Sequence, residues 1–381
     1  MKVVVAIDSL KGSLSSLEAG EAVKCGVLKA MPEAEVWVRP LADGGEGTVE
    51  ALVLGMGGTL ECVKVTGPLG EKVDCVYGIL EESKTAIIEM SGAAGITLVP
   101  VADRNPLHTT TYGVGEVIKD AIGKGCRHFI VGIGGSATND GGIGMLQALG
   151  YGMLDENGEQ VSFGAKGLKE ICAITDENVI PELKECTFRV ACDVRNPLCG
   201  ELGCSAVLGP QKGADAEMIR QMDQWFADYA RLTSGKYKKA DPEQAGTGAA
   251  GGLGFAFLAY TNAVLESGIQ IILEETKLES YVKEADIVVT GEGRLDGQTV
   301  FGKAPIGVAK IAKKYDKPVI AFSGAVTEDA VVCNEYGIDA FFPIMRKVQT
   351  LEEAMEPGNA RENMVAAVEQ VFRLLSRVYK I

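Results

Sequence analysis

Four loops in this chain combine glycine with acidic and basic side chains, and each lies at or near the end of a predicted strand. They span residues 8–13, 43–48, 132–140 and 291–303. Glycines let backbone N–H groups approach phosphate oxygens, and a helix that follows such a loop favours negative charge at its N-terminus. The four loops together predict a phosphate ligand, whereas any one of them alone is an ordinary turn sequence.

The side chains around these loops supply the charges that phosphoryl transfer needs. Because the chain has only two histidines, we expect carboxylates to act as the general acid or base. Carboxylates in glycine-rich or turn contexts are Asp8, Asp43, Glu46, Asp140, Asp193, Glu292 and Asp296. Cations beside such loops are Lys11, Arg195, Lys212, Arg294 and Lys303. Cations for the transferring group, carboxylates for Mg²⁺ and one carboxylate for the attacking hydroxyl are the parts of a small-molecule kinase.

Other catalytic motifs are weaker or missing. Residues 132–137 satisfy G-x-G-x-x-A after a strand, which keeps an NAD-dependent hydroxy-acid dehydrogenase as an alternative. Against that alternative, residues 139–142 delay the start of the helix, and Asp155, at about the distance of a ribose contact, lies in a predicted turn. A second match, at 246–251, has no strand before it. The sequence contains neither a P-loop motif nor a serine in G-x-S-x-G, which argues against P-loop enzymes and serine hydrolases.

Composition limits the class of protein further. With 381 residues, 46% hydrophobic and 23% charged, the chain is long enough for two globular domains. A net charge of −15 without a basic block argues against nucleic-acid binding. The N-terminal apolar run is too short for a signal peptide and the uncharged stretch 244–265 is rich in glycine, so we expect a cytoplasmic protein without a membrane partner. The ten cysteines form no C-x-x-C pair and are expected to be reduced thiols.

Short β-branched runs alternate with helical patterns, which is typical of an α/β protein with a largely parallel sheet. Ser15 and Glu18 predict a capping box at the first helix, and alternation over 59–89 predicts antiparallel strands. Strands are predicted at 3–7, 35–38, 129–131, 286–290, 319–322 and 340–342. Long helices are predicted at 215–232 and, with an interruption at 357–358, at 351–379.

The pattern predicts two α/β domains. Residues 1–66 and 283–381, from the two chain ends, are expected to form a Rossmann-like or flavodoxin-like parallel sheet domain. Residues 67–282 are expected to form an inserted α/β domain with a mixed sheet.

Six motifs, taken in order along the chain, resemble the class I bacterial glycerate kinases. They lie at residues 8–13, 42–48, 134–142, 191–198, 209–214 and 291–303. The resemblance runs from the first strand to the last helix. It implies ATP-dependent phosphorylation of D-glycerate, usually at the 2-hydroxyl, with Mg²⁺ as the metal and the active site in the cleft between the two domains.

Site roles follow from this resemblance together with the needs of a three-carbon hydroxy acid. We assign Arg294 to the glycerate carboxylate, with Lys11 as the alternative, and Asp193 as the base that orients the hydroxyl. Lys11 and Lys212 are assigned to the transferring phosphate. The expected metal ligands are Asp43, Glu46 and Glu292. The expected substrate-binding residues are Asp8, Ser9, Arg195, Asn196, Asp296, Gln298 and Thr299. The expected ATP-binding residues are Gly44, Gly45, Gly47, Thr48, Gly134, Gly135, Ser136, Asn139 and Lys303.

Several alternatives stay open at this point. A non-catalytic module that binds a sugar acid would keep the loops but not the chemistry, and the intact charged residues argue against it. Both the 2- and the 3-hydroxyl of glycerate need the same charges. The chain could act as a monomer or a homodimer.

Overall fold

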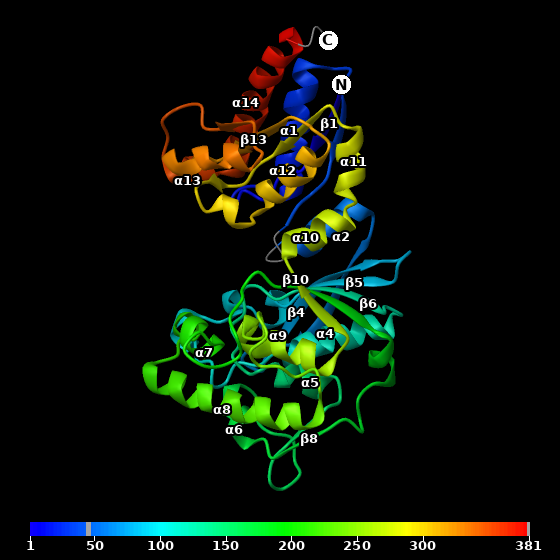
Figure 1. Ribbon diagram of the computed structural model, residues 1–381, viewed down its shortest axis with the longest axis vertical. Helices are drawn as coiled ribbons and strands as arrows, with labels where there is room; N and C mark the ends of the chain where they lie inside the picture. The colour runs from blue at the N-terminus through cyan, green and yellow to red at the C-terminus, as the bar shows by residue number, and fades with distance from the viewer. Residues whose placement is uncertain (43–46, 379–381) are drawn as a thin grey trace. The chain divides into compact units, whose positions relative to one another are not determined.

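The computed structural model describes residues 1–42 and 47–378, which divide into two compact units. Unit 1 contains residues 1–42, 50–56 and 269–378. Unit 2 contains residues 47–49 and 57–268. Each unit has its own sheet and its own hydrophobic core (Figure 1).

Unit 1 is built on a five-stranded parallel sheet in the order β15-β13-β11-β1-β2. Both chain ends contribute strands: β1 (Lys2–Val5) lies between β2 (Glu35–Val38) and β11 (Ile287–Thr290). The other two strands are β13 (Val319–Ser323) and β15 (Ala340–Pro343). Numbered along the unit, this is the 2-1-3-4-5 order of flavodoxin-like folds, whose switch point lies between β1 and β11.

Helices cover both faces of this sheet. On one face lie α1 (Ser16–Ala30) and α14 (Pro357–Val378) (Figure 1). Their side chains, such as Val23 and Val368, are buried in the core of unit 1. On the other face lie α11 (Leu278–Glu284) and α12 (Ala304–Lys314). The remaining elements are β12 (Arg294–Leu295), β14 (Ala325–Val326), α13 (Leu351–Met355) and the 3₁₀ helices η5 (Thr299–Phe301) and η6 (Glu328–Tyr336).

Two helices belong to both units. The chain passes from unit 2 to unit 1 in the first turn of α2 (Thr48–Met56), after Val49, and again at the start of α10 (Gly268–Glu275), after Gly268.

Unit 2 is built on a six-stranded mixed sheet in the order β10-β9-β6-β5-β4-β3. The first three strands in sequence, β3 (Thr59–Thr66), β4 (Lys72–Leu80) and β5 (Thr85–Glu89), are antiparallel neighbours. From β5 onward the pairs are parallel, through β6 (His128–Gly132), β9 (Thr187–Ala191) and β10 (Ala263–Glu266). The carboxyl ends of four strands therefore lie along one edge of this sheet.

Helices complete unit 2, and their apolar faces form its core. The longer ones are α4 (Tyr112–Gly123), α8 (Ala216–Lys236) and α9 (Ala249–Tyr260). The short helices are α3 (Ser91–Ala94), α5 (Ile143–Ala148), α6 (Ala165–Glu170), α7 (Cys204–Leu208), η1 (Ile96–Leu98), η2 (Val101–Asp103), η3 (Pro181–Glu185) and η4 (Pro210–Lys212). A small antiparallel pair joins β7 (Gly152–Leu154) to β8 (Ala173–Thr175).

The predicted fold class is confirmed: a parallel sheet comes from both chain ends, and the insert carries a mixed sheet. The capping box at Ser15 and Glu18 is present, as is the antiparallel meander of β3, β4 and β5. One prediction was incomplete. The stretch 244–265, expected to be a buried loop and helix, also contains most of the edge strand β10, because its alternating end pairs with β9.

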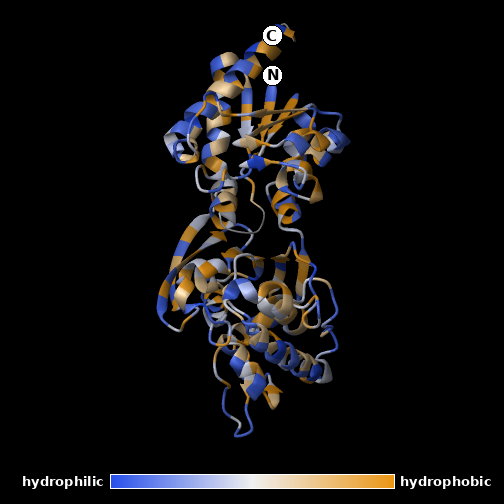
Figure 2. Cartoon of the chain, turned by 90° about the vertical axis from the view of Figure 1, so that its left-hand side faces the viewer, coloured by the Kyte–Doolittle hydropathy of each residue, from blue (hydrophilic) through white to orange (hydrophobic). Residues whose placement is uncertain are grey.

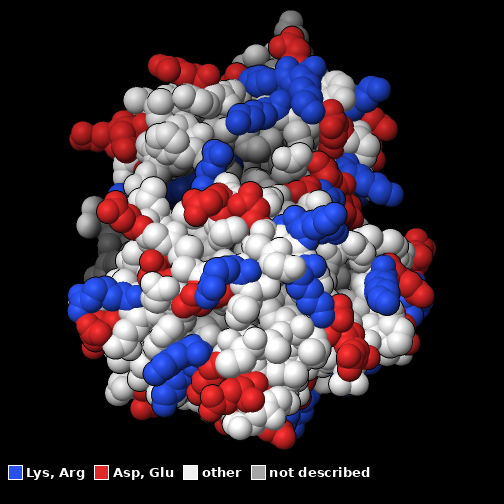
Figure 3. All heavy atoms as spheres, turned by 60° about the horizontal axis from the view of Figure 1, so that its bottom comes forward, with Lys and Arg blue, Asp and Glu red and all other residues white. Residues whose placement is uncertain are grey.

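The surface and the interior follow the expected chemistry. Hydrophobic residues lie along the strands of both sheets, and hydrophilic residues colour much of the helices' outer faces (Figure 2). On the face drawn in Figure 3, basic side chains are interspersed with acidic ones. All ten cysteines are free thiols. None of the helices in the described part of the chain is both long and apolar enough to cross a membrane.

Candidate functional site

The first group of predicted site residues lies at the switch point of the unit 1 sheet. Asp8 follows β1 and Glu292 follows β11, and the Asp8 backbone N–H donates to the Gly291 carbonyl oxygen at 2.9 Å. Gly291 has φ +156°, and a Cβ there would lie 1.8 Å from the Phe322 carbonyl oxygen. Only glycine at this position therefore lets the end of β11 pack this closely against β13. Ligands of open α/β sheets bind at the crevice of such a switch point.

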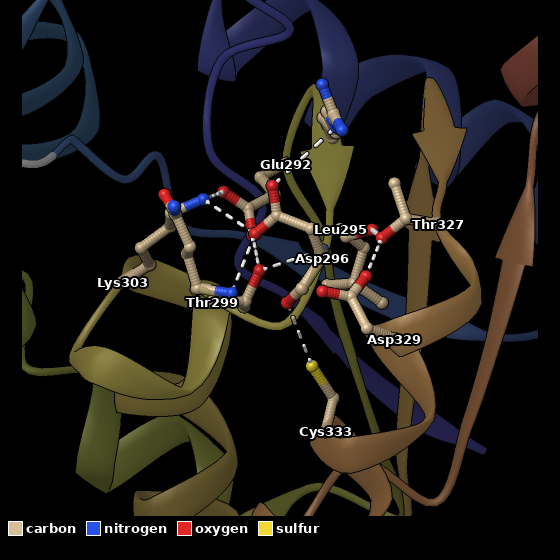
Figure 4. Close-up of polar contacts among 10 residues, drawn as sticks. Glu292, Leu295, Asp296, Thr299, Lys303, Thr327, Asp329 and Cys333 are labelled. Atoms are coloured by element: carbon tan, nitrogen blue, oxygen red, sulfur yellow. Dashed lines mark hydrogen bonds and ion pairs between the residues drawn. The ribbon is translucent and has the colours of Figure 1, made fainter.

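Glu292 is the centre of a charged cluster in unit 1 (Figure 4). The Thr299 hydroxyl donates to Glu292 Oε1 at 2.6 Å. Lys303 Nζ lies 3.5 Å from Glu292 Oε2 and 3.4 Å from Asp296 Oδ1, so one ammonium group bridges two carboxylates. Four residues that the sequence assigned separately to metal, substrate and nucleotide thus form one connected group.

The electrostatics of this cluster depend on how far each group is buried. Glu292 is 7% exposed, and burial raises the pKa of its carboxyl, while Thr299 and Lys303 act in the opposite direction. The Lys303 side chain is 39% exposed and can contact solvent or a ligand. In such a pair the carboxylate can bind another cation, and the accessible ammonium can bind a phosphate group.

Arg294 lies at the outer side of the same loop. Its Nε is 3.6 Å from Asp296 Oδ2, and its side chain is 67% exposed. Asp329, on η6, is charged and close enough to Arg294 to interact with it, and a hydrogen bond from the Thr327 hydroxyl is the main cause that lowers the pKa of Asp329. Sequence analysis did not identify Asp329, because nothing in its local sequence indicates that it faces residues 294–297.

The loop after β1 lies beside this cluster. A Cβ on Gly293 would be 3.5 Å from the Lys11 backbone nitrogen, so residues 10–11 and 293 are neighbours. The Ser9 backbone N–H donates to Asp8 Oδ1 at 2.7 Å. The Gln298 backbone N–H donates to Asp296 Oδ1 at 2.9 Å, which turns the loop toward η5. The predicted residues of motifs 8–13 and 291–303 therefore belong to one place in unit 1.

The second group lies in unit 2, in the loop between β6 and α5. Lys212 is 2% exposed, and its ammonium donates to Ser136 Oγ at 2.8 Å and to the Thr138 carbonyl oxygen at 2.6 Å. Burial lowers the pKa of Lys212 to about 8. Lys212 therefore holds the backbone and side chain of the glycine-rich loop from the protein interior.

Asp140 anchors the other end of this loop. Its carboxylate is fully buried and accepts hydrogen bonds from Thr111 N–H and Oγ1 at 2.8 Å and from Gly142 N–H at 3.0 Å. Burial raises the pKa of Asp140, and these hydrogen bonds oppose the rise. The neighbouring Asn139 side chain also points inward, because its Nδ2 donates to Ser205 Oγ at 2.9 Å.

The second G-x-G-x-x-G match, at 246–251, is explained by packing against this loop. Ala250, Gly251 and Gly252 at the start of α9 all have positive φ. A Cβ on Gly251 would lie 2.1 Å from the Thr138 carbonyl oxygen, so the segment packs directly on the loop that Lys212 holds. The first match, at 132–137, is not followed at once by a helix, because α5 begins only at Ile143. In the second match α9 begins at Ala249, but its first turn is interrupted by the positive φ angles of residues 250–252.

The loop after β9 carries Asp193, Arg195 and Asn196. Asp193 Oδ1 accepts hydrogen bonds from Ser267 Oγ at 3.0 Å and from Gly268 N–H at 3.2 Å. Arg195 is exposed, and the Asn196 Nδ2 donates to the Leu202 carbonyl oxygen at 2.8 Å. Asp193 thus contacts the start of α10, a partner that sequence analysis did not predict.

Some predicted residues have no described environment. Asp43, Gly44, Gly45 and Glu46 lie outside the described residues. Gly47, with φ +90°, and the buried Thr48 are described and lead into α2. Glu89, which sequence analysis missed, accepts a hydrogen bond from this segment; its position at the end of a strand beside β6 is the signal that could have identified it.

The fold and the site define an α/β protein of two units in which cations and carboxylates gather on glycine-rich loops at the carboxyl ends of parallel strands. A solved structure from Salmonella typhimurium LT2 with the provisional name glycerate kinase 2 superimposes with a TM-score of 0.92 at 45% identity, covering 100% of both chains. The model of the glycerate kinase family matches residues 3–376. The chain therefore belongs to the glycerate kinase family.

Curated relatives agree over nearly the whole chain. A protein of Haemophilus influenzae named glycerate kinase is 47% identical over 376 residues, which cover 99% of each chain. A protein of Escherichia coli K12 named glycerate 2-kinase is 45% identical over 376 residues, covering 99% of this chain and 98% of the relative.

Proposed function

We propose that this glycerate kinase transfers the terminal phosphoryl group of ATP to the 2-hydroxyl of D-glycerate in a Mg²⁺-dependent reaction. The observation that carries the proposal is the 45% identity, over 99% of this chain, to a relative named glycerate 2-kinase. In this reaction the 2-hydroxyl oxygen bonds to the terminal phosphorus, the bond between that phosphorus and ADP breaks, and the hydroxyl proton passes to an acceptor.

The unit 1 cluster supports a role in binding anionic groups. Arg294 is exposed and keeps a planar guanidinium available for the glycerate carboxylate. Lys303 is accessible beside Glu292 and suits a phosphate oxygen as a point charge. Lys11 adds a third cation to this loop cluster, because its backbone nitrogen lies beside Gly293. We propose that these three residues bind the substrate carboxylate and the phosphates, with Lys303 on ATP as the sequence predicts.

The same cluster fits a magnesium ion by its donor chemistry. Glu292, with Asp296 nearby, presents carboxylate oxygens of the kind that Mg²⁺ prefers, and Mg²⁺ in kinases is commonly held by one or two carboxylates and the phosphates. The ion would neutralise charge on the phosphate oxygens. Asp43 and Glu46 are retained as further ligands on the sequence argument alone.

The unit 2 loop supports a role in holding the nucleotide. Gly134, Gly135 and Ser136 lie at the carboxyl end of β6, where backbone N–H groups can reach phosphate oxygens. Lys212 beneath this loop keeps the loop in place and adds positive charge. The sequence predicts Asp193 as the orienting acceptor for the hydroxyl, whereas its Oδ1 accepts from Ser267 and Gly268, so the proposal does not rest on Asp193 as the base.

The test is ADP release from ATP and Mg²⁺, measured with a coupled assay in the presence and absence of D-glycerate. We expect release that depends on D-glycerate, with L-glycerate, glycolate and lactate as comparison substrates. Release that is the same without D-glycerate would contradict the proposal. No change at the nicotinamide absorbance band is expected with NAD and glycerate, which separates the kinase from the dehydrogenase alternative.

A further inference from the structure

A carboxylate at the end of β5 holds the first turn of α2. The Val49 backbone N–H donates to Glu89 Oε1 at 2.7 Å, across 40 residues of sequence. Val49 is the second residue of α2, and the first four N–H groups of a helix have no partner within it. Glu89 therefore supplies from a neighbouring strand the acceptor that an N-cap side chain usually supplies.

A second carboxylate does the same for α10. Asp193, two residues beyond β9, accepts from the Ser267 hydroxyl at 3.0 Å and from the Gly268 N–H at 3.2 Å, across 75 residues. Gly268 is the first residue of α10. The negative charge of each carboxylate also interacts favourably with the positive N-terminal end of the helix dipole.

These two contacts share one arrangement. Both carboxylates lie at the carboxyl edge of the unit 2 sheet, and their strands, β5 and β9, flank β6 on either side. Both helices are the ones in which the chain passes from unit 2 into unit 1, after Val49 and after Gly268. The loop that follows β6 is the glycine-rich loop held by Lys212.

We propose that Glu89 and Asp193 are positioning residues that fix the first turns of the crossing helices α2 and α10 on the two sides of the β6 loop. This inference rests on the proposed kinase function, and it gives Asp193 a structural partner in place of the substrate hydroxyl. Fixing α2 also fixes Gly47 and Thr48, which are predicted to bind the nucleotide and directly precede Val49.

Amide hydrogen exchange tests the contacts without any substrate. In the wild-type protein we expect the Val49 and Gly268 amides to exchange slowly, although they lie in first turns. Replacing Glu89 by Ala should raise exchange about tenfold in residues 48–56, and Asp193→Ala should do so in 267–275, as expected for a lost cap. Fast exchange of both amides in the wild type overturns the proposal, whether or not the variants fold.

Kinetics separate positioning from proton transfer. We expect Glu89→Ala and Asp193→Ala to lower kcat about 10- to 100-fold, as misplaced site loops do. Asp193→Asn keeps an oxygen that can accept from Ser267 and Gly268, so its kcat should stay within about threefold of wild type. If Asp193 is the base, Asp193→Asn should lose about 100-fold or more and equal Asp193→Ala, which would overturn its positioning role.

Asp155→Ala is the matched control. Asp155 accepts two backbone N–H groups, from Asn157 and Glu159, each at 2.9 Å, in an exposed turn of unit 2. The Asp155→Ala variant should raise amide exchange in that turn alone and leave kcat unchanged. A loss of kcat as large as that of Glu89→Ala would overturn the proposal. If the wild type lacks glycerate kinase activity, the proposed function fails, while the exchange experiment still decides the role of both carboxylates.

Discussion

The two units hold their charged residues in opposite ways. In unit 1, Lys303 and Arg294 are accessible and lie 3.4–3.6 Å from carboxylates of the same loop. In unit 2, Lys212 and Asp140 are buried and bind backbone groups and hydroxyls at 2.6–3.0 Å. The charged side chains of unit 1 can therefore bind a ligand, whereas those of unit 2 already bind groups of the protein interior.

The difference has an energetic basis. An accessible ion pair contributes between about 0 and 1 kcal/mol, so a ligand can replace one partner at little cost. Breaking a buried charged contact costs about 3–5 kcal/mol, because it leaves a charge without a partner in a poorly solvated place. We infer that unit 1 supplies side chains that bind the reacting groups, whereas unit 2 supplies a backbone loop of fixed geometry.

The largest effect on activity is expected when the accessible lysine of unit 1, Lys303, is removed. Lys303→Ala should lower kcat/KM by about 10³-fold, because it removes a cation that acts on the transferring phosphate. Its thermal stability should fall less than that of a variant of the fully buried Lys212, since the Lys303 side chain is 39% exposed. Lys310→Ala, at an exposed lysine on α12, the helix that Lys303 directly precedes, is the control. Equal activity of the two variants would contradict a role for Lys303 in the reaction.

The buried lysine of unit 2 should instead be visible in the pH dependence of stability. Because the pKa of Lys212 is lowered to about 8 from 10.5, the unfolded chain binds a proton between these pH values that the folded protein does not bind. The free energy of unfolding should therefore rise with pH across this window, by up to about 3 kcal/mol, as the cost of burying the charged form disappears.

Lys212→Met should lack this rise, and urea unfolding at pH 7, 8, 9 and 10 measures it. Lys238→Met makes the same chemical change at an exposed position of unit 2 and should keep the rise. If wild type and Lys212→Met have the same pH dependence, Lys212 is not the buried titrating group that the comparison requires.

A smaller effect, on the KM for glycerate, is expected at Asp329 in unit 1. Asp329 Oδ2 lies next to Gly297, with 2.6 Å to the position that a Cβ there would take, and its charge acts on Arg294. Asp329→Ala should raise the KM for glycerate about fivefold and change kcat less, because it loosens the loop that carries Arg294. The neighbouring exposed Glu328→Ala serves as the control. An unchanged KM in Asp329→Ala would remove Asp329 from the site.

Sequence reasoning predicted the parts of the molecule that local pattern determines. The strand end at Thr290, the capping box at Ser15 and the parallel sheet from both chain ends follow from hydrophobic period and turn residues. The first strand is predicted at 3–7, whereas β1 ends at Val5. The partners of Asp193, Glu89 and Asp329 could not be predicted, because each contact joins residues far apart in sequence. The burial of Lys212 could not be predicted from the sequence either, since a lysine beside glycines is usually exposed.

Phosphorus NMR of the product formed from D-glycerate, ATP and Mg²⁺ tests directly whether the phosphate is transferred to the 2-hydroxyl of glycerate. The phosphorus of a phosphate on the 2-hydroxyl couples to one proton of the adjacent carbon, and that on the 3-hydroxyl couples to two. We predict a new signal of the 2-phosphate that appears with D-glycerate and grows with the ADP released. A 3-phosphate signal, or ADP release without any glycerate phosphate, would contradict the assignment.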